Sequence, residues 1–143
     1  MGGGNTKSML AVWKEWGLDK ILKKAYKEGV VMSGVSAGAI CWFQNGITDS
    51  WDSNLKLMPC MNILKGTCCP HYDEEPERKP TVKKLILTKR IKNVFAVDCG
   101  TALHIKNEEK FNSVVFKKDK GSYEVTSNKG NLIEKIYKEI KLL

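Results

Sequence analysis

The sequence predicts an α/β fold in which a mostly parallel sheet carries helices on both faces, as three layers. Helix-like and strand-like segments alternate along the chain, and residues 30–32 (Val-Val-Met) are apolar throughout. A strand that is apolar on both faces belongs inside a parallel sheet, because helices cover both faces of such a sheet. Residues 2–4 are all glycine, and such a loop before a helix normally follows a strand. We therefore expect N-terminal strands of the domain to be missing.

The first helix is predicted over residues 7–28, where apolar side chains recur at helical spacing. Thr6 can cap this helix, and Gly17 can break or kink it. A strand at 30–32, a helix starting near Ala39 and a polar loop at 45–54 follow. The remaining predictions are a strand ending near residue 70, a helix at 81–90, strands at 93–97, 101–106, 113–118 and 122–127, and a final helix at 131–142.

Length and charge limit the class of protein. The 143 residues suffice for one domain with a hydrophobic core, which we place over the whole chain. The net charge is +8, but the lysines are scattered without a basic run, which argues against a nucleic-acid partner. No apolar run approaches the roughly 20 residues that cross a membrane. We expect neither a membrane partner nor a signal peptide.

The cysteines indicate a reducing environment. There are five, an odd number, and Cys68 and Cys69 are adjacent, which suits no disulfide framework. A cytoplasmic location is therefore expected. Together with His71, the adjacent pair matches no common spacing of zinc ligands, so we predict neither a metal site nor a cofactor.

Residues 34–38 (Gly-Val-Ser-Ala-Gly) lie between the apolar run and a helix start, which is the context of a nucleophile elbow. Side chains two positions either side of Ser36 would collide with neighbouring backbone in so tight a turn. The amide group of Ala37 would point to where an oxyanion forms. The same five residues are also compatible with an ordinary strand-to-helix turn.

A serine nucleophile needs a base, and the chain has two histidines. His104 lies on the more polar face of a predicted strand and is interpreted as a surface residue. His71 follows an apolar strand end and Pro70 at the head of a polar loop, where catalytic side chains are often placed. We therefore predict that His71 is the general base.

Four blocks of sequence occur in order along the chain: residues 2–6 (Gly-Gly-Gly-Asn-Thr), 34–39 (Gly-Val-Ser-Ala-Gly-Ala), 70–74 (Pro-His-Tyr-Asp-Glu) with Arg78, and 98–103 (Asp-Cys-Gly-Thr-Ala-Leu). Together they resemble the peptidase E (alpha-aspartyl dipeptidase) family of serine peptidases, more distantly related to cyanophycinase. The resemblance implies a fold similar to class I glutamine amidotransferases. It also implies cleavage of short peptides, including dipeptides with N-terminal aspartate, through an acyl-enzyme.

By position, the resemblance implies that Ser36 is the nucleophile and His71 the general base. A carboxylate must orient the imidazole ring, and spacing alone leaves Asp49, Asp52 and Asp98 open. The family pattern suggests an acidic residue in the loop after the elbow helix, so we choose Asp49.

The resemblance also assigns binding groups. Gly3 or Gly4 would supply an oxyanion amide beside that of Ala37. Arg78 would bind the acidic side chain of the substrate, because a guanidinium group can bind a carboxylate through two hydrogen bonds. Tyr72 is expected to contact the substrate beside it.

The chain departs from the family pattern in two ways. Some members carry glutamate after the strand in the last block, where this chain has Asp98-Cys99. Members are also longer, so we expect this chain to be the C-terminal two-thirds of the domain. It would then be poorly stable, or would associate as a homo-oligomer or with a missing N-terminal segment. Two alternatives stay open: an inactive fragment or interaction module that keeps the fold, and an amide hydrolase of cyanophycinase-like specificity.

Overall fold

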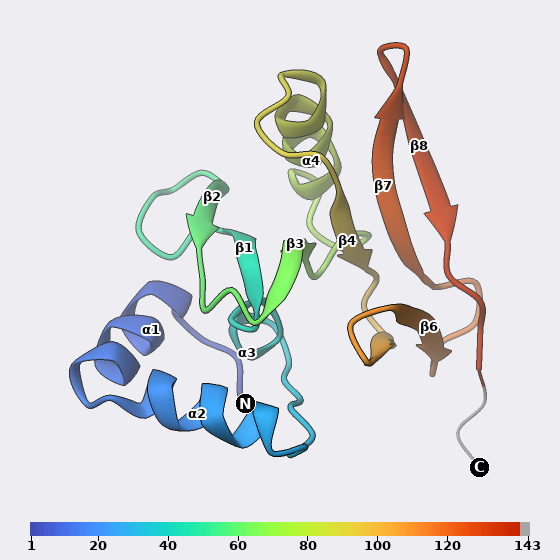
Figure 1. Cartoon of the computed structure of the whole chain (residues 1–143). Helices are drawn as coiled ribbons and strands as arrows, with labels where there is room; N and C mark the ends of the chain where they lie inside the picture. Colours follow the sequence, from blue (N-terminus) through green and yellow to red (C-terminus); the bar gives the residue numbers. More distant parts are fainter. Residues whose placement is uncertain (141–143) are drawn as a thin grey trace. The chain divides into compact units, whose positions relative to one another are not determined.

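The computed structural model describes residues 1–140 and shows a mixed α/β chain (Figure 1). The chain divides into two compact units, Met1–Lys65 and Gly66–Leu143. The prediction of an α/β fold is confirmed, but the prediction of a mostly parallel sheet is wrong. One strand pair of the second unit is parallel, whereas the hairpins of both units are antiparallel. The predicted three layers and the predicted single domain stay predictions.

The helix predicted over residues 7–28 is broken into two at Gly17, the position where a break or kink was expected. Asn5, not Thr6, caps the first helix, because its side chain accepts a hydrogen bond from the Ser8 amide at 2.9 Å. Gly17, with φ of 68°, separates the two helices. The elements of this unit are α1 (Thr6–Glu15), α2 (Leu18–Lys27), α3 (Ala37–Ile40), β1 (Phe43–Thr48) and β2 (Lys56–Pro59).

The core of the first unit forms around α3 and the β1–β2 hairpin. Ile40 and Ile47 are fully buried, and the ring centroids of Trp13 and Trp42 lie 6.3 Å apart. Because β1 starts at Phe43, residues 45–48 lie in a strand, and the loop predicted there is wrong for those positions. The Ser36 turn is therefore followed directly by elements that belong to this core, α3 and the β1–β2 hairpin.

The predicted strand at residues 30–32 is not formed. This segment lies between α2 and α3 without regular secondary structure, and Val31 is 89% exposed. The N-terminal residue is hydrogen-bonded to the residues that follow this segment. The Met1 amino group donates to the Ser33 carbonyl, and the Val35 amide donates to the Met1 carbonyl. An apolar run forms a buried strand only where neighbours cover it, and the first unit leaves Val31 uncovered.

The second unit pairs four strands and places one helix against them. β3 (Leu64–Cys69) begins at the end of the first unit, runs parallel to β4 (Val94–Val97), and β4 is antiparallel to β7 (Ser122–Asn128). α4 (Arg78–Leu87) buries Val82, Leu85 and Ile86. A separate hairpin joins β5 (Thr101–Lys106) to β6 (Lys110–Val115). The predicted helix at 81–90 and the strands at 93–97, 101–106 and 122–127 are confirmed, and the strand predicted at 113–118 begins earlier.

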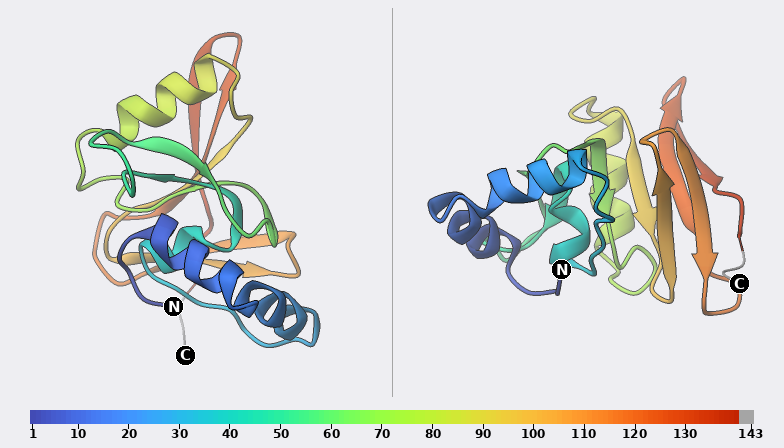
Figure 2. Two further views of the ribbon diagram at one scale, coloured as in Figure 1. Left: turned by 90° about the vertical axis from the view of Figure 1, so that its left-hand side faces the viewer. Right: turned by 60° about the horizontal axis from the view of Figure 1, so that its bottom comes forward.

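The final helix predicted at 131–142 is wrong. The chain instead forms β8 (Asn131–Ile136), which pairs antiparallel with β7 as an extended hairpin (Figure 2). Lys129 and Gly130 form the turn with φ of 49° and 82°, the backbone signature of a two-residue β-hairpin. This turn decides in favour of a strand although the apolar spacing also fits a helix. Residues 141 and 142 of the predicted helix lie outside the described residues.

Candidate active site

Ser36 lies at the apex of a strained turn at the start of α3. Its φ of 53° and ψ of −118° fall outside the regions that side-chain-bearing residues normally occupy. The turn continues directly into the helix, because the amides of Ala39 and Ile40 donate to the Ser36 carbonyl. The strained serine followed directly by a helix matches the second half of a nucleophile elbow, although the strand that normally precedes such a turn is not formed here.

The two flanking glycines are required by space. A Cβ atom on Gly34 would lie 1.9 Å from the Gly38 carbonyl oxygen, and one on Gly38 would lie 2.5 Å from that of Met1. Atoms cannot approach so closely, so the backbone would have to move if either glycine carried a side chain. The expectation that small residues are needed two positions either side of Ser36 is confirmed.

The glycine-rich opening lies against the Ser36 side chain. A Cβ atom on Gly3 would lie 3.3 Å from the Cβ and 3.8 Å from the Oγ atom of Ser36. Gly4 has a φ of 132°, which favours glycine. The first amides of a helix have no acceptor inside the helix, and Ala37 is the first residue of α3. The positions of these residues support their assignment as oxyanion donors, which stays a prediction.

A hydrogen-bond network connects the glycine-rich opening to the loop after β1. The Ser50 hydroxyl accepts from the Thr6 amide at 2.9 Å and lies 2.8 Å from the Thr48 hydroxyl. The Asn5 side chain donates to the Ser50 carbonyl at 2.6 Å. Ser50 was not predicted to contact the glycine-rich opening, because it is 45 residues from Asn5 in the chain and the two meet only in the fold.

The two acidic residues of this loop are placed differently. Asp49 is exposed and directly follows β1. Asp52 accepts from the Asn54 amide at 2.9 Å and pairs with Lys56 at 3.4 Å. The Asn54 hydrogen bond, helped by Lys56, holds the pKa of the Asp52 carboxyl below its usual range. Asp52 is thus held by its own loop, whereas the role of Asp49 in the triad stays a prediction.

His71 lies at the carboxyl end of β3, in a turn with φ of 54°. Its Nδ1 atom is 3.2 Å from the Sγ atom of Cys99, and its carbonyl accepts from the Glu75 amide. Burial, followed by the neighbouring Glu74 carboxylate, raises the pKa of the Cys99 thiol to about 11. Cys99 belongs to the sequence block 98–103, and only the fold places its sulfur beside His71.

Asp73 joins the loop that carries His71 to the turn that carries Cys99. Its Oδ1 atom accepts from the Cys99 amide at 2.7 Å, and its Oδ2 atom pairs with the Lys120 ammonium group. Partial burial alone would raise the pKa of Asp73, but the bonds with Lys120 and Cys99 outweigh it and lower that pKa. These two bonds hold the Asp73 side chain in place and fix the acidic loop against the turn after β4.

Asp98 is buried and its carboxylate is used inside the second unit. Its Oδ2 atom accepts from the Gly121 amide and from the Tyr123 hydroxyl, each at 3.1 Å. Burial and the nearby Asp98 carboxylate raise the pKa of Tyr123 to about 12. These bonds attach the start of β7 to the end of β4, which is a structural role for the carboxylate.

Arg78 and Tyr72, the predicted substrate contacts, are both buried. The Arg78 Nε atom donates to Glu75 at 2.7 Å, and the Tyr72 hydroxyl donates to Glu134 of β8. Burial alone would lower the pKa of Arg78, but the bond with Glu75 outweighs it and raises that pKa. Their roles toward a substrate stay predictions, and each side chain already has a partner within the second unit.

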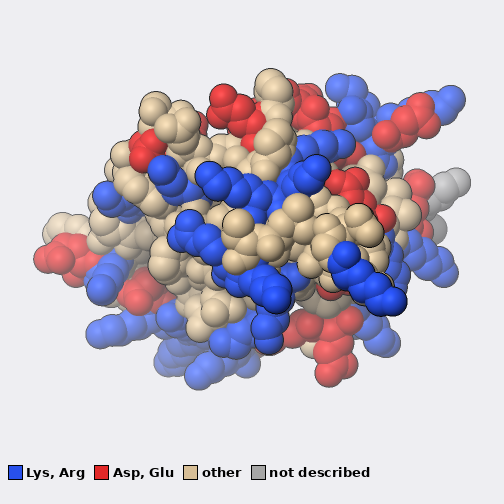
Figure 3. Space-filling model, turned by 90° about the horizontal axis from the view of Figure 1, so that it is seen from above, with Lys and Arg blue, Asp and Glu red and all other residues tan. Residues whose placement is uncertain are grey.

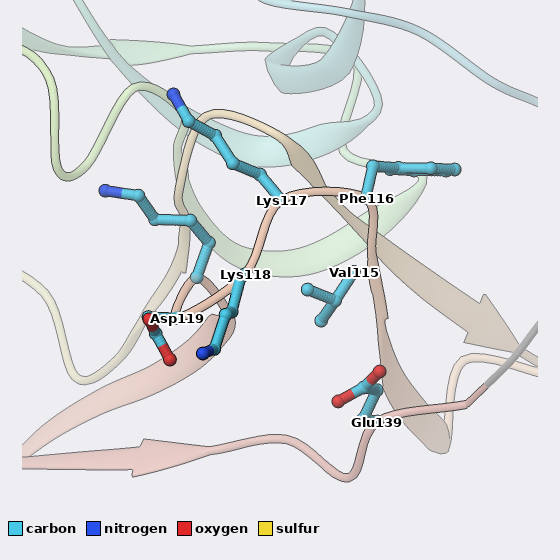
Figure 4. Close-up of a pocket in the computed structure, with 7 residues that line it drawn as sticks. Val115, Phe116, Lys117, Lys118, Asp119 and Glu139 are labelled. Carbon is cyan, nitrogen blue, oxygen red and sulfur yellow. The ribbon is translucent and has the colours of Figure 1, made fainter.

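The second unit also has an open pocket of about 440 Å³ (Figure 4). None of the residues lining it was predicted for the site; they are Val115, Phe116, Lys117, Lys118, Asp119, Lys120 and Glu139. On the face drawn in Figure 3, basic side chains lie among acidic ones. That no nucleic acid binds stays a prediction.

Comparison with known proteins identifies the family. The sequence pattern of peptidase family S51 matches residues 1–113. The chain belongs to peptidase family S51. This is the peptidase E family, which comprises serine peptidases, and the predicted resemblance is confirmed.

Two relatives give the extent of the match. The chain is 46% identical over 125 residues to the uncharacterized peptidase YgaJ of Bacillus subtilis (strain 168), across 87% of this chain and 54% of YgaJ. It is 26% identical over 113 residues to the uncharacterized peptidase Lmo0363 of Listeria monocytogenes, across 75% of this chain and 55% of that protein. This S51 chain thus spans about half the length of the curated relatives it matches. Among the described residues, no helix is both long and apolar enough to span a membrane.

Proposed function

We propose that this S51 chain carries the catalytic residues of a serine peptidase that cleaves short peptides through an acyl-enzyme. The observation that carries the proposal is the backbone of Ser36, with φ of 53° and ψ of −118° at the start of α3. A strained residue is retained where function requires it, and this strain presents a hydroxyl group at the apex of a turn.

In this proposal the Ser36 Oγ atom attacks the peptide carbonyl carbon while His71 accepts the hydroxyl proton. The amides of Ala37 and of Gly3 or Gly4 bind the resulting oxyanion. His71 then delivers the proton to the leaving amine, and the acyl group stays on Ser36. A water molecule, activated by His71, hydrolyses the acyl-enzyme.

The tautomer of His71 matters for this chemistry. A base acting through Nε2 must carry its proton on Nδ1, and Nδ1 faces the Cys99 sulfur. The third member of the triad is proposed to be Asp49, which would stabilise the imidazolium ion. For the substrate, we propose short peptides with an acidic N-terminal residue, which Arg78 would bind.

Labelling with a fluorophosphonate tests the nucleophile. The probe forms a covalent bond with an activated serine, and it should label the wild-type chain and fail to label Ser36→Ala. Ser33→Ala, which removes an exposed hydroxyl three residues away, is the matched control and should be labelled like the wild type. Equal labelling of Ser36→Ala and the wild type would reject the assignment.

A panel of dipeptides with aspartate, glutamate or a neutral residue at the N-terminus tests the substrate. Preference for the aspartyl and glutamyl dipeptides, lost in Arg78→Lys, supports the proposed role of the guanidinium group. Loss of a triad member should lower kcat by roughly 10⁴-fold or more. Cleavage that is indifferent to the N-terminal charge would instead favour a broader amide hydrolase.

A further inference from the structure

Three potential metal ligands meet in the second unit. One ligand atom each from His71, Glu74 and Cys99 lies within 4.8 Å of the others, and the nitrogen and sulfur are 3.2 Å apart. All three residues belong to the unit Gly66–Leu143. All three candidate ligands of the cluster therefore come from one compact unit.

Backbone contacts hold the cluster together without a metal. The Tyr72 amide donates to the Val97 carbonyl at 3.2 Å, and the Cys99 amide donates to Asp73 at 2.7 Å. These bonds fix the loop after β3 against the turn after β4, where the parallel strands end side by side. The site is thus preorganised, because the backbone around two of its ligands is already ordered.

We propose that His71, Glu74 and Cys99 bind one Zn²⁺ ion and leave the fourth coordination position open to water. A set of one nitrogen, one sulfur and one carboxylate oxygen suits zinc, whereas magnesium and calcium prefer oxygen alone. Three protein ligands with an open position are typical of exchangeable or catalytic zinc sites, and four of structural ones. This site differs from the Cys68–Cys69–His71 spacing considered in the sequence, since both of those cysteines are buried.

The distances require only a small adjustment. Zn–S and Zn–N bonds of ~2.3 and ~2.0 Å at a tetrahedral angle set the two ligand atoms about 3.5 Å apart. The observed 3.2 Å separation would therefore widen by a few tenths of an ångström, and the exposed Glu74 side chain can turn toward the ion.

The two acidic neighbours of Glu74 on this loop are already paired. Asp73 pairs with Lys120 and Glu75 with Arg78. The cation would therefore be held by the three ligands themselves. Zinc bound to a ring nitrogen of His71 would prevent the imidazole from accepting the hydroxyl proton of Ser36. Zinc is therefore inhibitory in this protein, a consequence that rests on the proposed function.

Titration with Co²⁺ tests the site, because Co²⁺ replaces zinc and its thiolate complexes absorb light. The wild-type chain should bind about one equivalent and develop a thiolate-to-cobalt band. Cys99→Ser should lose this band. Glu74→Gln should bind at least roughly 10-fold more weakly, because even loss of a residue that only supports a ligand costs about that much. The matched controls Cys60→Ser and Glu77→Gln change a thiol and an acid outside the cluster and should bind like the wild type.

Thermal unfolding followed by circular dichroism guards against misfolded variants. Zinc should raise the Tm of the wild type and of Ser36→Ala, but not of Cys99→Ser. If the wild type and Ser36→Ala both bind the metal, but the metal-free wild type does not react with a fluorophosphonate, the proposed function is rejected and the zinc site is kept. A cobalt band that is absent in the wild type, or unchanged in Cys99→Ser, would overturn the zinc site and leave the peptidase proposal standing.

Discussion

A Cβ atom on Gly34 would lie 1.9 Å from the carbonyl oxygen of Gly38, so the two glycines touch backbone to backbone across the Ser36 turn. Gly34→Ala should therefore lower the free energy of unfolding by about 1–3 kcal/mol, the usual range for overpacking, and should slow fluorophosphonate labelling. Urea unfolding followed by circular dichroism measures the first effect. Gly2→Ala, where a Cβ atom meets nothing within 4 Å, is the control and should match the wild type.

The strain at Ser36 predicts an opposition between stability and activity. Ser36→Gly and Ser36→Ala both remove the hydroxyl, but only glycine adopts a φ of 53° without strain. Ser36→Gly should therefore have a free energy of unfolding about 1 kcal/mol or more above that of Ser36→Ala. Urea midpoints measured under the same conditions decide this. Equal stability of the two variants would show that the turn is relaxed in solution.

Replacing the candidate carboxylates separates structure from catalysis. Asp98→Ala leaves the Gly121 amide and the Tyr123 hydroxyl without their acceptor, so it should destabilise the second unit by about 2 kcal/mol or more. Asp49→Ala is exposed and should change stability by less than about 0.5 kcal/mol while lowering kcat. Thermal melts and dipeptide hydrolysis test both variants. Full activity of Asp49→Ala would remove this residue from the proposed triad.

Two thiols of the first unit predict a loss of stability at alkaline pH. Burial raises the pKa of Cys41 and of Cys60 to about 12, from a usual value near 9. The unfolded chain therefore releases these protons first, and the free energy of unfolding should be greatest below pH 9 and fall as the pH approaches 12. Urea midpoints across this range measure the slope. Cys41→Ala should flatten it, whereas a change at the less buried Cys99 thiol should have a smaller effect.

The exposed apolar segment between α2 and α3 predicts self-association. Val31 is 89% and Val30 53% exposed, and such runs attract other apolar surfaces. Sedimentation should show a mass that rises with protein concentration, and Val31→Lys should shift the distribution toward the monomer. Glu28→Gln, which also raises the net charge by one at an exposed position beside the segment, is a control for charge alone. A concentration-independent monomer in the wild type would contradict the prediction.

Local chemistry determined much of what the sequence could predict. The Gly34–Ser36–Gly38 pattern predicted the elbow because steric exclusion acts over five consecutive residues. The break at Gly17 and the helix near residues 81–90 also follow from local preference and periodicity. The order of four short blocks identified the S51 family because each block is a contiguous motif.

Only the tertiary structure decided which distant residues meet. The final segment has an apolar spacing that fits a helix, yet pairing with β7 across the Lys129–Gly130 turn makes it β8. Cys99 lies beside His71 because parallel strands β3 and β4 end together, although 28 residues separate the two side chains in the chain. Strand pairing and side-chain contacts of this kind join residues that are far apart in the sequence. Their free energy therefore cannot be predicted from a local sequence pattern.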